Sequence, residues 1–226
     1  MPRKRALLTA AEITGMWALL CTPAKPGAED WRSEDTVDLE ETARVVDELI
    51  KAGTDGLLSM GTLGEAATLN LEEKKAVMAT LVESARGRVP VFVGTTTLNT
   101  RDTIALTRFA SDLGADGTML GIPMWCAPSV ATAVRFFKDV AEACPTMAIC
   151  VYANPEAFKF DFPFPFWAQL AGTPQVVAAK YVGIVGLLQN IELTAHRIRF
   201  MPSDINYYAG ARIDPEFVTA FWSSSA

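Results

Sequence analysis

The chain contains the stretch Met147-Ala148-Ile149-Cys150-Val151-Tyr152, an unbroken apolar run that ends in a phenol, and the stretch Val176-Val177-Ala178-Ala179-Lys180, which ends in an amine. Continuous rather than alternating hydrophobicity is typical of parallel strands that are covered on both faces. We expect the two strands to deliver Tyr152 and Lys180 at their carboxyl ends. An amine and a phenol placed in this way indicate imine chemistry on a keto acid rather than metal or nucleotide chemistry.

The same kind of apolar run recurs along the whole sequence, with helical patterns in between. Eight runs are found, at 16–21, 56–60, 89–93, 117–120, 147–151, 176–179, 198–201 and 217–222. Eight strand and helix units in one chain predict a (β/α)8 TIM barrel, whose typical length is about 250 residues. The alternative is a doubly wound open sheet, but no G-x-G-x-x-G sequence follows the first strand and no P-loop sequence is present.

The two ends of the sequence look different from the middle. Residues 1–12 are expected to form a frayed tail, because the basic start is followed by an apolar stretch too short for a signal sequence. Residues 13–226 are expected to form the barrel domain. Its last units are short and the sequence stops at Ala226, where an eighth helix should begin. The predicted barrel therefore lacks the final helix and a C-terminal helical extension, unless a neighbouring chain covers that place.

Several helix boundaries are visible in the sequence. Asn70 followed by Glu73 predicts a capping box, and Gly87 predicts the end of that helix. Thr100 is expected to cap the next helix, with Gly114 after its end. These signals place helices between the apolar runs, as a barrel requires.

Composition excludes several classes of function. Half of the residues are hydrophobic, enough for one large core, and the formal net charge of -6 comes from scattered side chains, which argues against nucleic acid as a partner. No apolar stretch approaches the roughly 20 residues that a membrane-spanning helix needs. The four cysteines have no metal-type spacing and His196 is the only histidine, so we expect neither a metal nor a cofactor. These features predict a cytoplasmic protein without membrane or nucleic-acid partners.

Lys180 is the one lysine at a predicted strand end, and the apolar residues before it are expected to bury its amine. Burial disfavours the charged form of an amine, and a neutral amine adds to a ketone carbonyl. The alternative is a lysine that extends into solvent, which the spacing alone favours at least equally. Tyr152 is either a proton shuttle or an ordinary strand-end tyrosine.

Other strand-end residues are weaker candidates. The loop Gly61-Thr62-Leu63-Gly64-Glu65 offers closely spaced N–H groups and a hydroxyl that suit a carboxylate, although many such turns are glycine-rich. Trp125 and Trp222 are expected either to pack in the core or rim, or to wall a planar aromatic substrate.

Taken together, these motifs resemble a known family. Gly61-Thr62-Leu63-Gly64-Glu65, Val151-Tyr152-Ala153-Asn154-Pro155 and Lys180 are similar, in order and spacing, to the pyruvate-dependent class I aldolases of the dihydrodipicolinate synthase and N-acetylneuraminate lyase superfamily. Within it, Pro123-Met124-Trp125 and Ala220-Phe221-Trp222 resemble the hydratase-aldolases of polycyclic aromatic breakdown. The resemblance implies a barrel, usually tetrameric, that hydrates an arylidene pyruvate and cleaves it to an aromatic aldehyde and pyruvate.

The resemblance also implies a role for each site residue. Lys180 would be the Schiff-base lysine and Tyr152 the proton shuttle. Thr62 and the Leu63 amide, in the loop that begins at Gly61, would hold the pyruvate carboxylate. Asn154 and Trp222 would contact the hydroxylated or aromatic end of the substrate, and Trp125 would belong to its pocket.

Two departures from the superfamily pattern affect the expected substrate. A second hydroxyl residue usually stands where this chain has Leu63, and the synthases have tyrosines near Met124 and Trp125. The pocket is therefore expected to be more apolar, which favours an aryl substrate. The rivals are a lyase or synthase of the same fold for an aliphatic or sugar keto acid, a non-catalytic truncated barrel and, more distantly, a metal-dependent aldolase.

Overall fold

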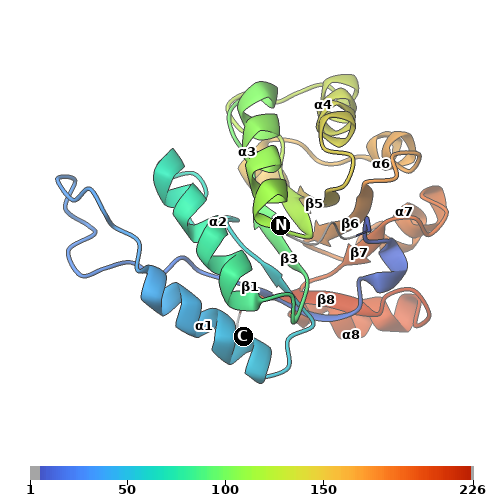
Figure 1. The fold of residues 1–226 in the computed structure, drawn as a ribbon. Helices are drawn as coiled ribbons and strands as arrows, with labels where there is room; N and C mark the ends of the chain where they lie inside the picture. The colour runs from blue at the N-terminus through green and yellow to red at the C-terminus, as the bar shows by residue number, and fades with distance from the viewer. Residues whose placement is uncertain (1–5, 225–226) are drawn as a thin grey trace.

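The computed structural model describes residues 6–224 and shows eight parallel strands ringed by helices, which is a (β/α)8 TIM barrel (Figure 1). The strands are β1 (Gly15–Leu19), β2 (Gly56–Leu58), β3 (Val91–Gly94), β4 (Gly117–Leu120), β5 (Ala148–Ala153), β6 (Val176–Tyr181), β7 (Arg199–Met201) and β8 (Ala220–Ser223). Their order is β7-β6-β5-β4-β3-β2-β1-β8, and an isolated bridge joins Ser203, just after β7, to Trp222 in β8. The barrel is thus nearly closed, and the doubly wound alternative is wrong.

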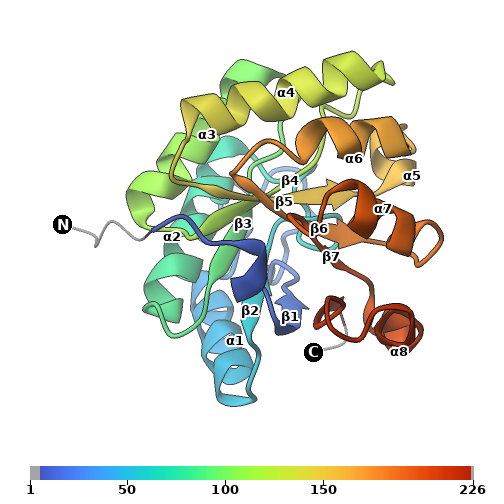
Figure 2. The ribbon, with the colours of Figure 1, turned by 90° about the vertical axis from the view of Figure 1, so that its right-hand side faces the viewer.

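The helices follow one another around the strands in chain order, as Figures 1 and 2 show. They are α1 (Leu39–Lys51), α2 (Leu71–Ala85), α3 (Thr100–Leu113), α4 (Val130–Ala143), α5 (Pro155–Phe158), α6 (Phe164–Leu170), α7 (Leu187–Leu193) and α8 (Asp204–Ile213). In the part of the chain that the structure describes, no helix follows β8. No helix within residues 6–224 is both long and apolar enough to cross a bilayer.

Helix caps test the boundaries that the sequence predicted. The capping box of Asn70 and Glu73 is present at the start of α2. The prediction for Thr100 is wrong, because Asn99 is the cap of α3 and its side chain accepts a hydrogen bond from the Asp102 N–H. Asparagine is at least as good an N-cap residue as threonine. The N-cap is therefore Asn99, one residue before the predicted one, and Thr100 is the first residue of α3.

The predicted N-terminal tail is partly folded. Residues 1–5 lie outside the described residues, whereas Ala10–Glu12 form a 3-10 helix. The Arg199 Nε atom, from β7, donates to the Ala10 carbonyl over 3.1 Å, and Leu7 and Leu8 pack against the core. This segment therefore contacts the amino-terminal side of the barrel.

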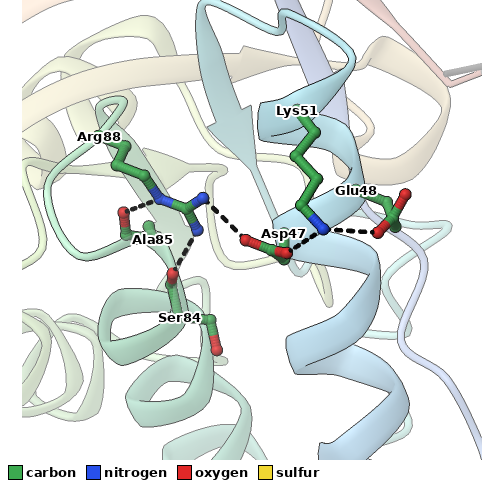
Figure 3. A network of polar contacts seen from close by, with 6 residues as sticks. All are labelled: Asp47, Glu48, Lys51, Ser84, Ala85 and Arg88. Atoms are coloured by element: carbon green, nitrogen blue, oxygen red, sulfur yellow. Dashed lines mark hydrogen bonds and ion pairs between the residues drawn. The ribbon is translucent and has the colours of Figure 1, made fainter.

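A polar network joins α1 to the end of α2 on the surface (Figure 3). Arg88 donates to Asp47 over 2.8 Å and to the Ser84 carbonyl over 2.9 Å, and Asp47 also pairs with Lys51 over 2.8 Å. Hydrogen bonds from Lys51 and Arg88 lower the pKa of Asp47. Because the pairs are exposed to solvent, they orient the two helices more than they stabilise the fold.

The barrel interior is filled by large rings packed over glycines. Trp17 and Phe92 meet edge to face with 5.0 Å between ring centroids. Trp17 pairs across the sheet with Gly56, and Phe92 pairs with Gly117. A Cβ atom would lie 2.5 Å from the Trp17 ring at Gly56 and 2.7 Å from the Phe92 ring at Gly117. The two glycines therefore leave the space that the rings occupy.

We expect Gly56→Ala to lower the free energy of unfolding by about 1–3 kcal/mol, which is the usual cost of overpacking a filled core. Gly172→Ala is the matched control, because nothing lies within 4 Å of the Cβ position there. Urea denaturation of both variants measures the difference. Equal midpoints for the two variants would show that the Trp17 ring does not need the space at Gly56.

Candidate active site

Lys180 and Tyr152 meet at the carboxyl ends of β6 and β5. The two residues are partners in the sheet register, so both side chains point to the barrel interior. Lys180 is 3% exposed, and its Nζ atom lies 4.7 Å from the centroid of the Tyr152 ring. The predicted pair is therefore brought together, and the reading of Lys180 as a solvent-exposed lysine does not fit this position.

The surroundings of Lys180 favour its neutral form. Burial lowers the pKa of its amine to about 8. Within residues 6–224 no carboxylate lies within ion-pair distance of the amine. The neighbouring thiol of Cys150 stays uncharged, since burial raises its pKa to about 12. With a pKa of about 8, roughly a tenth of the amines are neutral at pH 7, about 300 times more than at the ordinary lysine value.

Trp222 contacts the amine directly. The Nζ atom of Lys180 lies 3.3 Å from the centroid of the Trp222 ring. The indole Nε1 donates to the Tyr181 carbonyl over 2.9 Å, which fixes the ring across the barrel mouth. An indole face attracts an ammonium group and also shields it from water. Trp222 is thus a neighbour of the reactive nitrogen.

Tyr152 is the centre of a short chain of polar groups. Its hydroxyl lies 2.9 Å from the Thr62 Oγ1 atom, and the Asn154 Nδ2 atom donates to it over 3.3 Å. Phe158 packs edge to face against the phenol with 5.3 Å between centroids. The sequence did not predict the contact between Phe158 and Tyr152. The position of Phe158 in the short helix that follows Asn154 was the signal that could have indicated it.

A sharp turn after β2 carries Thr62 to this place. Met60 has a φ of 50°, a left-handed conformation that is rare for residues other than glycine. Its carbonyl lies against Gly94, where a Cβ atom would be only 2.2 Å from the carbonyl oxygen. The next residue, Gly61, is buried near Tyr152, since a Cβ there would be 3.5 Å from the Tyr152 ring. The turn therefore needs a small residue at Gly94 on β3 and another at Gly61 in the loop after β2.

The loop after Gly61 presents backbone donors. The carbonyls of Gly61 and Thr62 accept hydrogen bonds from Ala66 and Glu65, which folds the loop into turns. No acceptor is found for the N–H groups of Thr62 and Leu63 among the residues that the structure describes. The Leu63 side chain is about half exposed. Two free N–H groups beside a hydroxyl form an arrangement that suits a carboxylate.

Trp125 lies apart from this group. It stands on the loop after β4 with 79% of its surface exposed, and its carbonyl accepts a hydrogen bond from Lys159 over 3.3 Å. It lines a cavity of about 880 Å³ together with Leu98 and Pro123. No hydrogen bond or ring contact joins it to Lys180 or Tyr152 within the described part of the chain. Its part in a substrate pocket stays a prediction.

Contacts thus join an amine, a phenol, an amide and a hydroxyl, and two N–H donors lie in the loop that carries the hydroxyl. Lys180, Tyr152, Thr62, Gly61, Asn154 and Trp222 belong to this group. Such a set can bind a carboxylate, form an imine at an adjacent ketone and move protons at that carbon.

Comparisons with known proteins agree with this chemistry. The model of the dihydrodipicolinate synthetase family matches residues 28–223. The trans-O-hydroxybenzylidenepyruvate hydratase-aldolase of Sphingobium xenophagum is 61% identical over 98% of this chain and 67% of that protein. The trans-2'-carboxybenzalpyruvate hydratase-aldolase of Nocardioides sp. (strain KP7) is 39% identical over 96% of this chain and 66% of that protein. The chain therefore spans about two thirds of the length of these relatives.

One solved structure is similar over nearly the whole of this chain. It is PhdJ bound to a substrate intermediate, with a TM-score of 0.95 and 43% identity over 98% of this chain and 69% of that one.

Proposed function

The chain belongs to the dihydrodipicolinate synthetase family, and from this premise we propose that it is a class I, Schiff-base hydratase-aldolase. Its proposed reaction cleaves an arylidene pyruvate to an aromatic aldehyde and pyruvate, as a carbon-carbon lyase of polycyclic aromatic catabolism. The observation that carries the proposal is the buried amine of Lys180, 4.7 Å from the ring of a tyrosine that is hydrogen-bonded to Thr62.

The first stage is formation of the imine. The carboxylate of the keto acid binds the hydroxyl of Thr62 and the Leu63 N–H, which places the C2 ketone at Lys180. The neutral amine adds to C2, and Tyr152 gives its proton to the departing hydroxyl, so that water leaves and an iminium remains. Because the iminium withdraws electrons from the conjugated alkene, water adds at C4 and a proton is added at C3.

The second stage breaks the bond between C3 and C4. The phenolate of Tyr152 takes the proton of the new C4 hydroxyl, the aldehyde forms, and the electron pair of the broken bond passes into the iminium to give an enamine. Protonation of the enamine at C3 and hydrolysis release pyruvate and restore the amine. The protons balance if Tyr152 also protonates C3 of the enamine and takes back the proton that hydrolysis of the pyruvate iminium releases, so that it gives two protons and takes up two in each cycle.

An aryl substrate is supported by the residues around the amine. The Trp222 ring covers Lys180, an apolar Leu63 stands in the loop after β2, and a Cβ at Gly61 would lie 3.0 Å from the Met119 side chain. A polyol would leave its hydroxyls unpaired against these groups. The names of the relatives that are 61% and 39% identical also support an arylidene pyruvate.

We further propose that the protein works as a homo-oligomer, most simply a tetramer, in the cytoplasm. Exposed apolar side chains support an assembly, since Leu98 and Trp125 are 63% and 79% exposed and line the same cavity. Four free cysteines support a reducing compartment.

The pH dependence of imine formation tests the proposed role of Lys180. Exchange of deuterium from the solvent into the methyl group of pyruvate requires the imine and its enamine, and NMR follows it without an aryl substrate. Since only the neutral amine adds to the ketone and its pKa is lowered to about 8, the exchange rate should rise from pH 6, reach half its maximum near pH 8 and level off above it. A rate that is independent of pH, or that still rises beyond pH 10, would contradict the proposal.

A further inference from the structure

Asn154 is the N-cap of the short helix α5, and its side chain also donates a hydrogen bond to the hydroxyl of Tyr152. We propose that Asn154 is a positioning residue, whose amide directs the hydroxyl proton of Tyr152 away from itself and toward Thr62 and the reacting atoms. The inference rests on the proposed function and deepens it, because it concerns the residue that moves the protons.

The orientation of the Asn154 amide is fixed by its role as a cap. Its Oδ1 atom accepts a hydrogen bond from the Ala157 N–H over 3.2 Å at the start of α5. A backbone N–H only donates, so the oxygen of the amide has to face the helix and the nitrogen has to face away from it. That nitrogen is the atom that lies 3.3 Å from the Tyr152 hydroxyl.

The direction of the hydrogen bond to Tyr152 follows from this orientation. An amide nitrogen has hydrogens to give and no lone pair to offer, so the phenol oxygen is the acceptor. The single hydrogen of the phenol is then free for Thr62, whose Oγ1 atom lies 2.9 Å away, or for the substrate. After the proton has left, Asn154 still donates to the same oxygen, as the negatively charged intermediate of the shuttle requires.

The backbone around Asn154 keeps the amide in place. Pro155 at the first position of α5 restricts the residue before it to an extended conformation, and Asn154 has a φ of -117° and a ψ of 97°. At the other end of the helix, Phe158 packs on the phenol ring. Phe158 occupies the space above Gly121, where a Cβ would lie 2.0 Å from its ring. The helix therefore contacts Tyr152 both at its hydroxyl and at its ring.

Asn154→Asp separates capping from positioning. Aspartate caps a helix as well as asparagine does, so α5 is retained, but a carboxylate accepts the phenol proton instead of donating to the oxygen. We expect kcat to fall by about 10- to 100-fold, a part of the usual contribution of acid-base catalysis, while KM changes much less. Asn70→Asp is the matched control, because Asn70 caps α2 through the same kind of bond and should keep its kcat.

A double-mutant cycle tests whether Asn154 acts through Tyr152. In a Tyr152→Phe background, Asn154→Asp should have no further effect on kcat. Asn154→Ser, which caps the helix without reaching the phenol, should also lower kcat and serves if the aspartate variant does not fold. Unchanged kcat in both variants, a change in KM alone, or an equal loss in the Tyr152→Phe background would overturn the positioning role.

Borohydride trapping of the imine on Lys180 distinguishes a wrong role for Asn154 from a wrong mechanism for the protein. With pyruvate and borohydride, the wild type and the Asn154 variants should all carry a reduced adduct on Lys180, detected by mass spectrometry after digestion. An adduct in every protein together with unchanged kcat overturns only the role of Asn154. No adduct in the wild type overturns the imine mechanism itself.

Discussion

Lys180→Met is expected to reduce the release of aldehyde and pyruvate from an arylidene pyruvate by about 10⁴-fold or more, because a thioether cannot form the imine on which every later step depends. Methionine has nearly the length of lysine and is apolar, so the buried position, 3% exposed, accepts it. The expected change in the free energy of unfolding is below about 1.5 kcal/mol, the usual range for swaps of similar volume. Absorbance of the aldehyde measures the rate, and urea denaturation measures the stability.

Lys51→Met is the control for removing a lysine charge, since Lys51 lies on the surface of α1 in a pair with Asp47. It should keep the wild-type rate. Full turnover by the Lys180 variant would disprove the Schiff-base mechanism. Faster turnover of an aliphatic keto acid than of any arylidene pyruvate by the wild type would instead favour a lyase of another substrate class in the same family.

Tyr152→Phe is expected to lower kcat by about 10²-fold or more, within the range that general acid-base catalysis contributes. The variant removes the oxygen that Thr62 and Asn154 contact but keeps the ring that packs against Phe158. The Lys180 amine is untouched, so slow imine formation should remain measurable by borohydride trapping over hours. Binding of the carboxylate by the loop after β2 should leave KM within a few-fold of the wild type.

Tyr207→Phe is a suitable comparison, because Tyr207 lies on α8, its ring is tilted against Phe221, and no contact between it and Lys180 or Tyr152 is found in the described part of the chain. It should retain turnover. If Tyr152→Phe kept the wild-type kcat, the proton shuttle would have to be assigned to another group, and the contact between Thr62 and the phenol would be structural only.

The barrel could be predicted from the sequence because its strands are apolar on both faces. The run 117–120 forms β4 with the predicted bounds, and Val176 begins β6 as predicted. Strand ends were predicted less well. Phe217 begins the apolar run that predicts the last strand, but it lies in the loop before β8, which begins at Ala220. A side chain that is apolar in the sequence can be buried by a loop as well as by a strand, and composition does not distinguish the two.

The positions of the candidate site residues could be predicted where the register of neighbouring strands fixes them, but not where they lie on loops. Tyr152 and Lys180 end neighbouring parallel strands, which forces them together. Trp125 stands on a loop whose path no periodicity encodes, and it lies exposed. The left-handed turn at Met60 has no signature in the sequence, because it depends on the close approach of Gly94 on the neighbouring strand. Asn154-Pro155 is a helix-start signal, but the sequence does not show that the capping side chain also reaches Tyr152.

The bridge between Ser203 and Trp222 makes one seam of the barrel much narrower than the others, which are held by runs of paired residues. Trp222 also reaches over β7 to bond the Tyr181 carbonyl beside the reactive lysine. If β8 swings out, the indole leaves with it, water reaches the nitrogen, and the amine regains the proton affinity of a free lysine. The lowered pKa of the Lys180 amine therefore depends on Trp222 staying over it, and so on the single bridge that holds β8 beside the residues after β7.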